Sequence, residues 1–348
     1  MAAPTGIVLC NMGGPDSLDG VEPFLRQLFS DPALIQLPLG FLWQKAFAKL
    51  VARRRAPRVR ELYRSIGGRS PLGELTARQA AALEAELTRR GHECRCVVAM
   101  SYSAPFAAHA AAQLRQSGIT RVVGLTLYPQ YSRATTGSAL RGLRRALEVA
   151  GGGFLYTEID RYFDDPAYLD AVAGTVSRAL AAVPGDAPVL FSAHGLPQRY
   201  VDRGDPYERE VNATVAGVVA RLGLEGRFRL GFQSRVGPIK WLEPATDTVI
   251  RALGAGGATA LVCVPVAFVS DHLETLQEID LLYRDLAREV GITAFSRAPA
   301  LNDDPAFITA LAGLVQRHLE TGDARAHGGP AAPPAAPGSG ARATLGAA

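Results

Sequence analysis

The sequence is poor in cysteine and has no long hydrophobic run. Its cysteines show neither a CxxC pair nor the spacing of a zinc site, which predicts free thiols in a reducing compartment for Cys10, Cys94, Cys96 and Cys263. No apolar segment approaches the roughly 20 residues that span a bilayer. Residues 1–6 show no basic region followed by an apolar core, so no export signal is predicted. We therefore expect a cytoplasmic protein.

A large excess of charge of one sign is also missing. The 348 residues carry a formal net charge of +4, and the 37 Lys and Arg residues are interspersed with the 33 Asp and Glu residues. Nucleic-acid-binding proteins concentrate their basic residues on one face, so we expect no nucleic-acid partner. A chain of this length with 48% hydrophobic residues has enough material for one large core or two cores of ordinary domain size.

What the sequence does contain is a repeated alternation of short apolar runs and helical patterns. The runs show little polar alternation, as expected of parallel strands covered on both faces; they span residues 6–12, 94–102, 121–128, 154–159, 188–193, 228–233, 258–269 and 292–297. Helical patterns cover residues 76–90, 166–183 and 207–222. We predict an α/β fold of two Rossmann-like, doubly wound parallel-sheet halves, 1–160 and 161–322, followed by a disordered Ala, Pro and Gly-rich tail at 323–348.

Two of the apolar runs end in clusters of reactive side chains. Ser-Ala-His-Gly, containing His194, follows one run, and Ser-Asp-His-Leu-Glu, containing His272 and Glu274, follows another. Open parallel sheets bind ligands outside the carboxyl ends of their strands, so we predict that both clusters build one site. The alternative for each histidine is a structural role beside a buried strand, and His272 could instead orient its neighbours.

Acidic residues continue beyond the second cluster. If residues 271–285 are helical, Glu274 and Glu278 lie one turn apart on the same face. Like charges at this spacing repel unless a cation or a proton lies between them. The pair therefore predicts a short path for a metal ion or a proton, with a solvated acidic face as the alternative for Glu278.

Together these segments resemble the ferrochelatase family, whose members insert ferrous iron into a porphyrin to make haem. The resemblance covers the chain from Thr5 to Leu319. The matching segments lie at residues 11–15 (Asn-Met-Gly-Gly-Pro), 63–71 (Tyr-Arg-Ser-Ile-Gly-Gly-Arg-Ser-Pro), 128–138, 191–197, 203–207 (Arg-Gly-Asp-Pro-Tyr), 233–242 and 265–280. The resemblance implies two Rossmann-like halves with a porphyrin in the cleft between them.

The resemblance also implies roles for particular residues. His194 and Glu274 would face each other at the metal-insertion site. A neutral imidazole can accept a pyrrole proton and can also bind Fe2+, and a carboxylate can hold the ion or relay the second proton. We expect both residues and Glu278 to contact the metal, and which of His194 and Glu274 takes the proton stays open.

A second set of residues is implied in porphyrin binding. Met12 and Tyr102 would lie against the macrocycle. A cation and two hydroxyl groups near a propionate would come from Arg55, Tyr63 and Ser70. The alternative for residues 53–55 is a solvated basic turn.

Three departures from the family pattern restrict these expectations. Ser101 stands where the family usually has Arg, and Leu282 stands where the acidic stripe would continue. Arg133 occupies the family's internal cysteine position for a [2Fe-2S] cluster, and the tail has no cysteine. We therefore expect no iron-sulfur cluster and no permanently bound cofactor, with Fe2+ as a substrate.

The substrate is expected to be protoporphyrin IX, because enzymes that act on coproporphyrin III tend to have Tyr at the position of Met12. Coproporphyrin III is the alternative substrate, and a tetrapyrrole carrier without enzymatic activity is the alternative function. The apolar segment at residues 31–45, broken by two prolines and a glycine, predicts either a lip in transient contact with a membrane surface or a hydrophobic ligand, or an ordinary packed connection.

Overall fold

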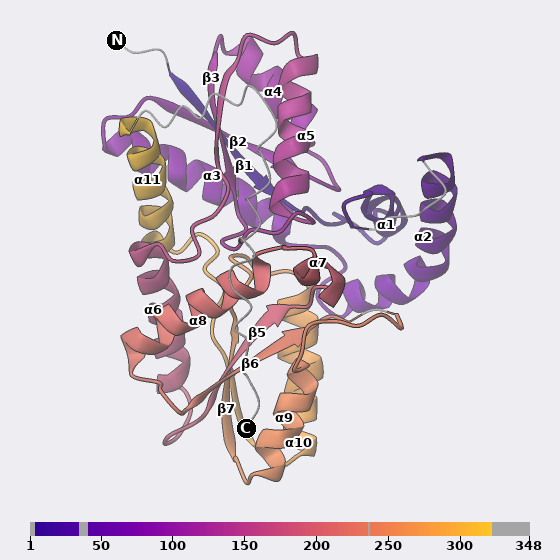
Figure 1. The fold of residues 1–348 in the computed structure, drawn as a ribbon, viewed down its shortest axis with the longest axis vertical. Coiled ribbons are helices and arrows are strands. Elements are labelled where there is room, and N and C mark those ends of the chain that lie inside the picture. Colours follow the sequence, from indigo (N-terminus) through magenta and orange to yellow (C-terminus); the bar gives the residue numbers. More distant parts are fainter. Residues whose placement is uncertain (1–3, 35–40, 236, 322–348) are drawn as a thin grey trace, which may run out of the picture.

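The computed structural model describes residues 4–34, 41–235 and 237–321. The tail predicted at 323–348 and the middle of the apolar segment at 31–45 lie outside the described residues. The described strands form two parallel sheets of four strands each, one in each half of the elongated molecule (Figure 1). The predicted α/β fold with two Rossmann-like halves is confirmed.

The first sheet has the strand order β2-β1-β3-β4. Its strands are β1 (Thr5–Asn11), β2 (Cys94–Met100), β3 (Arg121–Thr126) and β4 (Leu155–Ile159). The helices of this half are α1 (Val21–Ser30), α2 (Phe41–Arg64), α3 (Leu72–Arg89), α4 (Ala107–Gln116) and α5 (Thr136–Val149). Every residue of β1 is buried, which explains why this run shows no polar alternation.

The second sheet repeats this order as β6-β5-β7-β8. Its strands are β5 (Val189–His194), β6 (Phe228–Gln233), β7 (Ala260–Pro265) and β8 (Ala294–Arg297). Around them lie α6 (Pro166–Ala181), α7 (Gln198–Asp202), α8 (Tyr207–Leu222), α9 (Thr246–Ala255), the π-helix η1 (Glu274–Tyr283), α10 (Arg284–Glu289) and α11 (Pro305–Glu320). The run predicted as a strand at 258–269 is shorter than expected: β7 ends at Pro265, and the residues after it form a loop.

One apolar cluster reaches both sheets. It contains Leu9 and Leu125 from the first sheet together with Phe191 and Val264 from the second. Burying one such side chain completely stabilises a fold by about 1.5–3 kcal/mol. The shared cluster therefore holds the two sheets in a defined relation, which places their carboxyl ends near each other.

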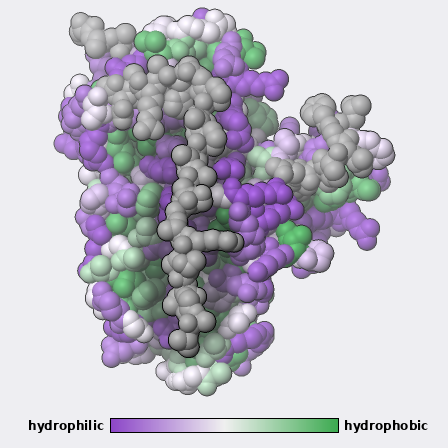
Figure 2. Space-filling view, in the orientation of Figure 1, coloured by the Kyte–Doolittle hydropathy of each residue, from purple (hydrophilic) through white to green (hydrophobic). Residues whose placement is uncertain are grey.

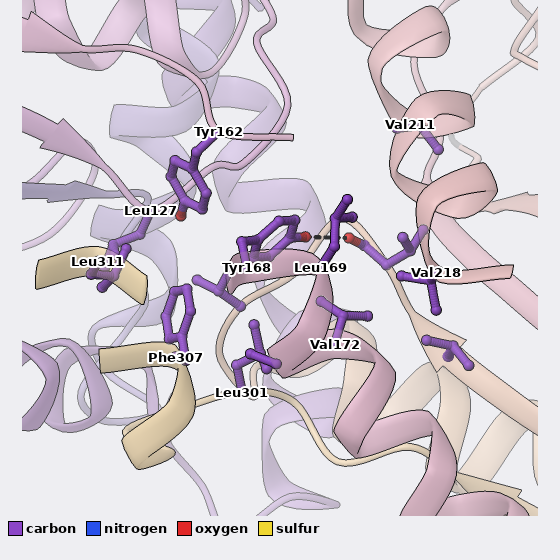
Figure 3. Close-up of a cluster of buried hydrophobic side chains, with 14 of the residues drawn as sticks. Leu127, Tyr162, Tyr168, Leu169, Val172, Val211, Val218, Leu301, Phe307 and Leu311 are labelled. Carbon is purple, nitrogen blue, oxygen red and sulfur yellow. Dashed lines mark hydrogen bonds between the residues drawn. The ribbon is translucent and has the colours of Figure 1, made fainter. Parts of the chain in front are cut away.

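Helices α6 and α11 supply the centre of this cluster (Figure 3). The Tyr168 ring of α6 packs edge-on against Tyr162 at 5.3 Å and against Phe307 of α11 at 6.5 Å between ring centroids. Both helices begin with an Asp-Pro pair whose Asp accepts backbone hydrogen bonds, a strong signal for a helix start. Helix α11 also packs against α3, so the last helix returns to the first half.

Helices α1 and α2 pack against each other and project to one side of the sheets (Figure 1). The projecting lobe shows both hydrophilic and hydrophobic side chains (Figure 2). On α2, Trp43 is 63% and Leu50 is 68% exposed. The start of the apolar segment is packed, since the carbonyls of Ala33 and Leu34 share the Tyr200 hydroxyl. None of the helices in the described part of the chain is long and apolar enough to cross a membrane.

Candidate functional site at the carboxyl ends of the strands

His194 is the last residue of β5, at the carboxyl end of the second sheet. Its carbonyl oxygen accepts a 2.9 Å hydrogen bond from the Tyr207 hydroxyl, which holds this end of the strand. Among the described residues, its buried Nδ1 atom has no hydrogen-bond partner. Burial lowers the pKa of His194, and the nearby Glu274 opposes this shift. The ring is therefore neutral at physiological pH and has a nitrogen ready for a proton or a metal ion.

His272 lies beside this ring in the loop after β7. The Phe268 ring contacts both histidines, with its centroid 5.8 Å from that of His194 and 4.0 Å from that of His272. The Nδ1 atom of His272 lies 3.1 Å from the Ser270 carbonyl, and its Nε2 atom lies 3.3 Å from Glu274 Oε2 without hydrogen-bond geometry. Burial lowers the pKa of His272. His272 therefore lies beside Glu274, and its role in orienting its neighbours stays a prediction.

Asp271 anchors the loop. Its carboxylate accepts hydrogen bonds from Arg297 Nη1 at 2.8 Å, from the Thr275 hydroxyl at 3.0 Å and from Asn302 Nδ2 at 3.0 Å. These bonds occupy both carboxylate oxygens. Asp271 is therefore a structural residue of the site, and it fixes the start of the helix that carries the acidic pair.

The helix predicted at 271–285 begins later than expected and is a π-helix from Glu274 to Tyr283. Asp271 and His272 lie before it, because their hydrogen bonds hold them in the loop. π-Helical turns occur frequently at functional sites. Gln233 contacts both glutamates, since its Nε2 donates to the Glu274 backbone carbonyl at 3.1 Å and to Glu278 Oε2 at 2.9 Å.

Glu278 is held by two donors in a desolvated position. The Ser234 hydroxyl donates to Glu278 Oε2 at 2.7 Å, in addition to the Gln233 bond. Ser234 has a φ of 64°, a left-handed conformation that is uncommon for a residue other than glycine and that places its hydroxyl here. Burial, with a smaller contribution from Glu274, raises the pKa of Glu278 to about 7. Glu278 is therefore not part of a solvated acidic face, and it exchanges a proton near neutral pH.

Gln233 and Ser234 are functional candidates that the sequence analysis did not single out. The Ser192 hydroxyl donates to Gln233 Oε1 at 2.6 Å, so the Gln233 amide must turn its NH2 group toward Glu278. Ser192 also lies 2.9 Å from the Thr246 hydroxyl. This network joins the strand of His194 to the helix of the acidic pair. The signal available in sequence was the position of Gln233 and Ser234 at the carboxyl end of β6.

The first half contributes an apolar cluster to the same place. Met12, Tyr63 and Tyr102 pack in one cluster that includes Leu273, the residue before Glu274. Burial raises the pKa of Tyr63, and the charge of Glu274 raises it further. The structure therefore brings three of the predicted porphyrin contacts next to the predicted catalytic residues.

Ser70 and Arg55 border this cluster. A side chain at Gly14 would place its Cβ 2.4 Å from Ser70 Oγ and 3.8 Å from Tyr63 Oη, so glycine is needed for this close approach. Arg55 lies over the ring of Phe29, a member of the same cluster, at 5.6 Å. Burial lowers the pKa of Arg55.

Exposure separates Arg55 from its neighbours on α2. Arg53 and Arg54 are exposed, whereas Arg55 is half-buried. The interpretation of residues 53–55 as one solvated basic turn is therefore wrong for Arg55.

Tyr102 uses its hydroxyl within the protein. The hydroxyls of Tyr102 and Ser138 both donate to Asp31 Oδ2, the former at 2.7 Å. Only the ring of Tyr102 is left to contact a ligand.

No group of three or more His, Cys, Asp and Glu side chains in the described part of the chain is arranged to hold a metal ion. The metal contacts predicted for His194, Glu274 and Glu278 therefore remain a prediction for a transient substrate ion.

Comparisons with known proteins identify the family. The ferrochelatase family model matches residues 4–319. The ferrochelatase of Geotalea uraniireducens is 47% identical over 323 residues, covering 92% of this chain and all of that protein. The ferrochelatase of Synechococcus sp. (strain JA-3-3Ab) is also 47% identical, covering 91% of this chain and 94% of that protein.

Among solved structures, SirB from Bacillus subtilis with Fe3+ has the same fold, with a TM-score of 0.56 at 10% identity over 92% of this chain and 98% of that one. The predicted resemblance is thus confirmed, and the chain belongs to the ferrochelatase family, the porphyrin metal chelatases.

Proposed function

We propose that this enzyme inserts Fe2+ into protoporphyrin IX to form protohaem, with release of the two pyrrole protons. The observation that carries the proposal is the meeting of two unlike sets of side chains. His194 with its unpartnered nitrogen and the Glu274–Glu278 pair come from the second half, and the apolar cluster of Met12 and Tyr102 comes from the first.

The titratable groups supply the proton acceptors that metal insertion needs. Neutral His194 accepts one pyrrole proton at the ring nitrogen that carries no hydrogen. Glu278, with a pKa of about 7, accepts the second pyrrole proton when it leaves the ring nitrogen. Glu274, whose Oε2 lies 3.3 Å from His272 Nε2, supplies the negative charge that attracts the ion to the ring. Two protons leave the ring and one divalent ion enters it, so the charge of the porphyrin ring is conserved.

The half-buried Arg55, with the Tyr63 and Ser70 hydroxyls, is proposed to bind a propionate. A guanidinium and hydroxyls are the donors that a carboxylate accepts best. Met12, partly buried against the apolar cluster, offers an apolar wall, which favours the apolar ring edge of protoporphyrin IX over the additional propionates of coproporphyrin III.

The test is anaerobic insertion of Fe2+ into protoporphyrin IX and into coproporphyrin III, followed by absorbance. Turnover with protoporphyrin IX at the higher kcat/KM supports the proposal. A preference for coproporphyrin III would contradict the substrate assignment and leave metal insertion intact. Tight porphyrin binding without insertion of any metal would contradict the enzymatic function and favour a carrier.

We also propose that the enzyme works in the cytoplasm, without a permanently bound cofactor, and touches a membrane surface transiently through α2. The exposed Trp43 and Leu50 support the membrane contact, because large exposed apolar side chains near basic residues suit an interfacial position. Cosedimentation with anionic lipid vesicles tests it: Trp43→Ser should bind less than the native chain, whereas equal binding would contradict the contact.

A further inference from the structure

A basic pocket is lined by residues other than those of the candidate porphyrin site. It has a volume of about 210 Å³ and is lined by Ala33, Arg133, Arg141, Tyr200 and Arg203. Arg141 belongs to α5 of the first half, Tyr200 belongs to α7 of the second half, and both helices appear in Figure 1. Three cationic side chains from two halves of the molecule therefore share one small concavity.

Two of the three arginines, Arg133 and Arg141, are not balanced by a carboxylate within the described residues. Within the described residues, neither Arg133 nor Arg141 forms an ion pair with an acidic side chain; Arg141 Nη2 makes a long contact of 3.5 Å to the Arg133 carbonyl. All three arginines are exposed, so a solute can reach them. Guanidinium groups gathered in this way repel one another unless an anion lies between them.

Two carboxylates flank Arg203 in sequence: Asp202 accepts a 3.2 Å hydrogen bond from Gln198 Nε2, and Asp205 is also already used. Its Oδ2 accepts hydrogen bonds from the Ser132 hydroxyl at 3.0 Å and from the Arg133 backbone N–H at 2.8 Å, and its Oδ1 accepts one from the Tyr207 N–H at 3.1 Å. Asp205 is 4% exposed, and it shapes the two loops that carry Arg133 and Arg203. The same bonds therefore build the pocket and keep Asp205 occupied.

We propose that this pocket binds a small oxyanion of the phosphate class. Its volume is below the roughly 300–1,000 Å³ of pockets for drug-sized ligands, so a tetrapyrrole does not fit and a compact anion does. Planar guanidiniums bind phosphate oxygens in pairs, and three of them can surround one tetrahedral ion. Tyr200 shares its hydroxyl with the Ala33 and Leu34 carbonyls and contributes its ring as a wall. A bound anion bridges the two halves.

The phosphate can come from free orthophosphate or from a larger phosphorylated solute, and two titrations distinguish these sources. Isothermal calorimetry at constant ionic strength uses sodium orthophosphate in one arm and ATP in the other, against the full chain without porphyrin or metal. Because neither substrate is present, the result does not depend on the proposed iron and porphyrin specificity.

The variants are Arg133→Gln and Arg141→Gln, with Arg145→Gln as the matched control. Arg145 is exposed on the same helix as Arg141, one turn further along, and does not line the pocket. Arg and Gln have similar helix propensities, so the helix is retained. Loss of one charge-assisted contact should weaken binding about tenfold or more in the two pocket variants, while the control binds as the native chain does.

Stronger binding of orthophosphate identifies the free ion as the ligand, and stronger binding of ATP identifies a phosphorylated solute. Either outcome supports the proposal when Arg133→Gln and Arg141→Gln lose the binding. The proposal is overturned by binding that disappears when NaCl of equal ionic strength replaces the buffer salt. It is also overturned by binding that is equally strong in the pocket variants and in Arg145→Gln.

Discussion

The two halves share one strand order and differ in the chemistry at the carboxyl ends of their strands. The first half presents groups whose charge is constant near neutral pH, namely Met12, the tyrosines Tyr63 and Tyr102, whose pKa values are raised, and Arg55. The second half presents groups suited to proton transfer: His194, whose pKa burial lowers, and Glu278, whose pKa burial raises to about 7. The two halves thus share one topology, but the first is suited to holding a ligand and the second to moving protons.

This division has a physical basis in what each half packs around its strand ends. In the first half, the lobe of α1 and α2 covers the strand ends with apolar and aromatic side chains. In the second half, the loop after β7 and the π-helix bring His272 and Glu278 into a desolvated position where burial shifts their pKa values. Changes in the first half should therefore alter binding, and changes in the second half should alter turnover.

The largest expected effect follows from His194→Ala. Removing the neutral base should lower kcat for Fe2+ insertion between about 100-fold and 10,000-fold, with KM for porphyrin little changed. The fold should tolerate the change, because the buried Nδ1 atom of His194 has no partner among the described residues. His92→Ala is the control and should match the native chain. His92 precedes the amino end of β2, whereas the site lies at the carboxyl ends of the strands. A comparable loss in the control, or none in His194→Ala, would contradict the assignment.

The next effect concerns pH. Since the ionised form of Glu278 accepts the second proton, activity should rise as the pH increases through about 7, the pKa to which burial raises this carboxyl. Glu278→Gln should lower kcat about tenfold to 100-fold and remove this limb of the kcat profile. Exposed Glu289, in α10, gives the control Glu289→Gln, which should keep the limb. A limb retained in Glu278→Gln would assign it to another group.

A smaller effect, on porphyrin binding and not on turnover, is expected in the first half. Arg55→Gln should raise KM for porphyrin about tenfold and leave kcat nearly unchanged, since it removes a charge-assisted contact made equally in the ground state and the transition state. Arg54→Gln, the exposed neighbour on α2, should behave as the native chain does. A fall in kcat with an unchanged KM would place Arg55 in the proton chemistry and break the comparison between the halves.

The last effect is on stability and not on activity. The pKa of Glu278 is raised from an ordinary 4.5 to about 7 in the folded chain, so ionisation costs folding free energy as the pH rises from about 4.5 to 7 and the full cost remains above 7. Glu278→Gln should remove this cost. Its free energy of unfolding relative to the native chain should increase between pH 5 and pH 8 by up to about 3 kcal/mol, measured by urea denaturation. A difference that does not vary with pH would show that the folded-state pKa is not raised.

The fold could be predicted from sequence because its strands are buried on both faces and read as plain apolar runs. Residues such as Val8 and Leu190 are 0% exposed, as expected of strands buried on both faces. The exact end of β7 and the π-helical form of η1 could not be predicted in this way. They depend on tertiary hydrogen bonds from Arg297 and Asn302 to Asp271, which leave no local periodicity.

The candidate site was predictable where reactive side chains directly follow strands, as for His194 and Glu274. Gln233 and Ser234 were missed because their importance lies in their orientation toward Glu278. That orientation is set by Ser192 on the neighbouring strand and by the backbone of Ser234. Amide and hydroxyl residues at strand ends are common in turns, so their type alone does not distinguish them.

The division between the halves is tested most directly by measuring porphyrin affinity and chemical rate separately in the same two variants. Protoporphyrin binding is followed by fluorescence quenching, and Fe2+ insertion is followed by absorbance in a single anaerobic turnover with enzyme in excess. We predict that His194→Ala binds porphyrin as the native chain does and inserts iron at least about 100-fold more slowly, while Arg55→Gln binds about tenfold more weakly and, once saturated, inserts iron at the native rate. Equal losses of affinity and rate in both variants would contradict the account.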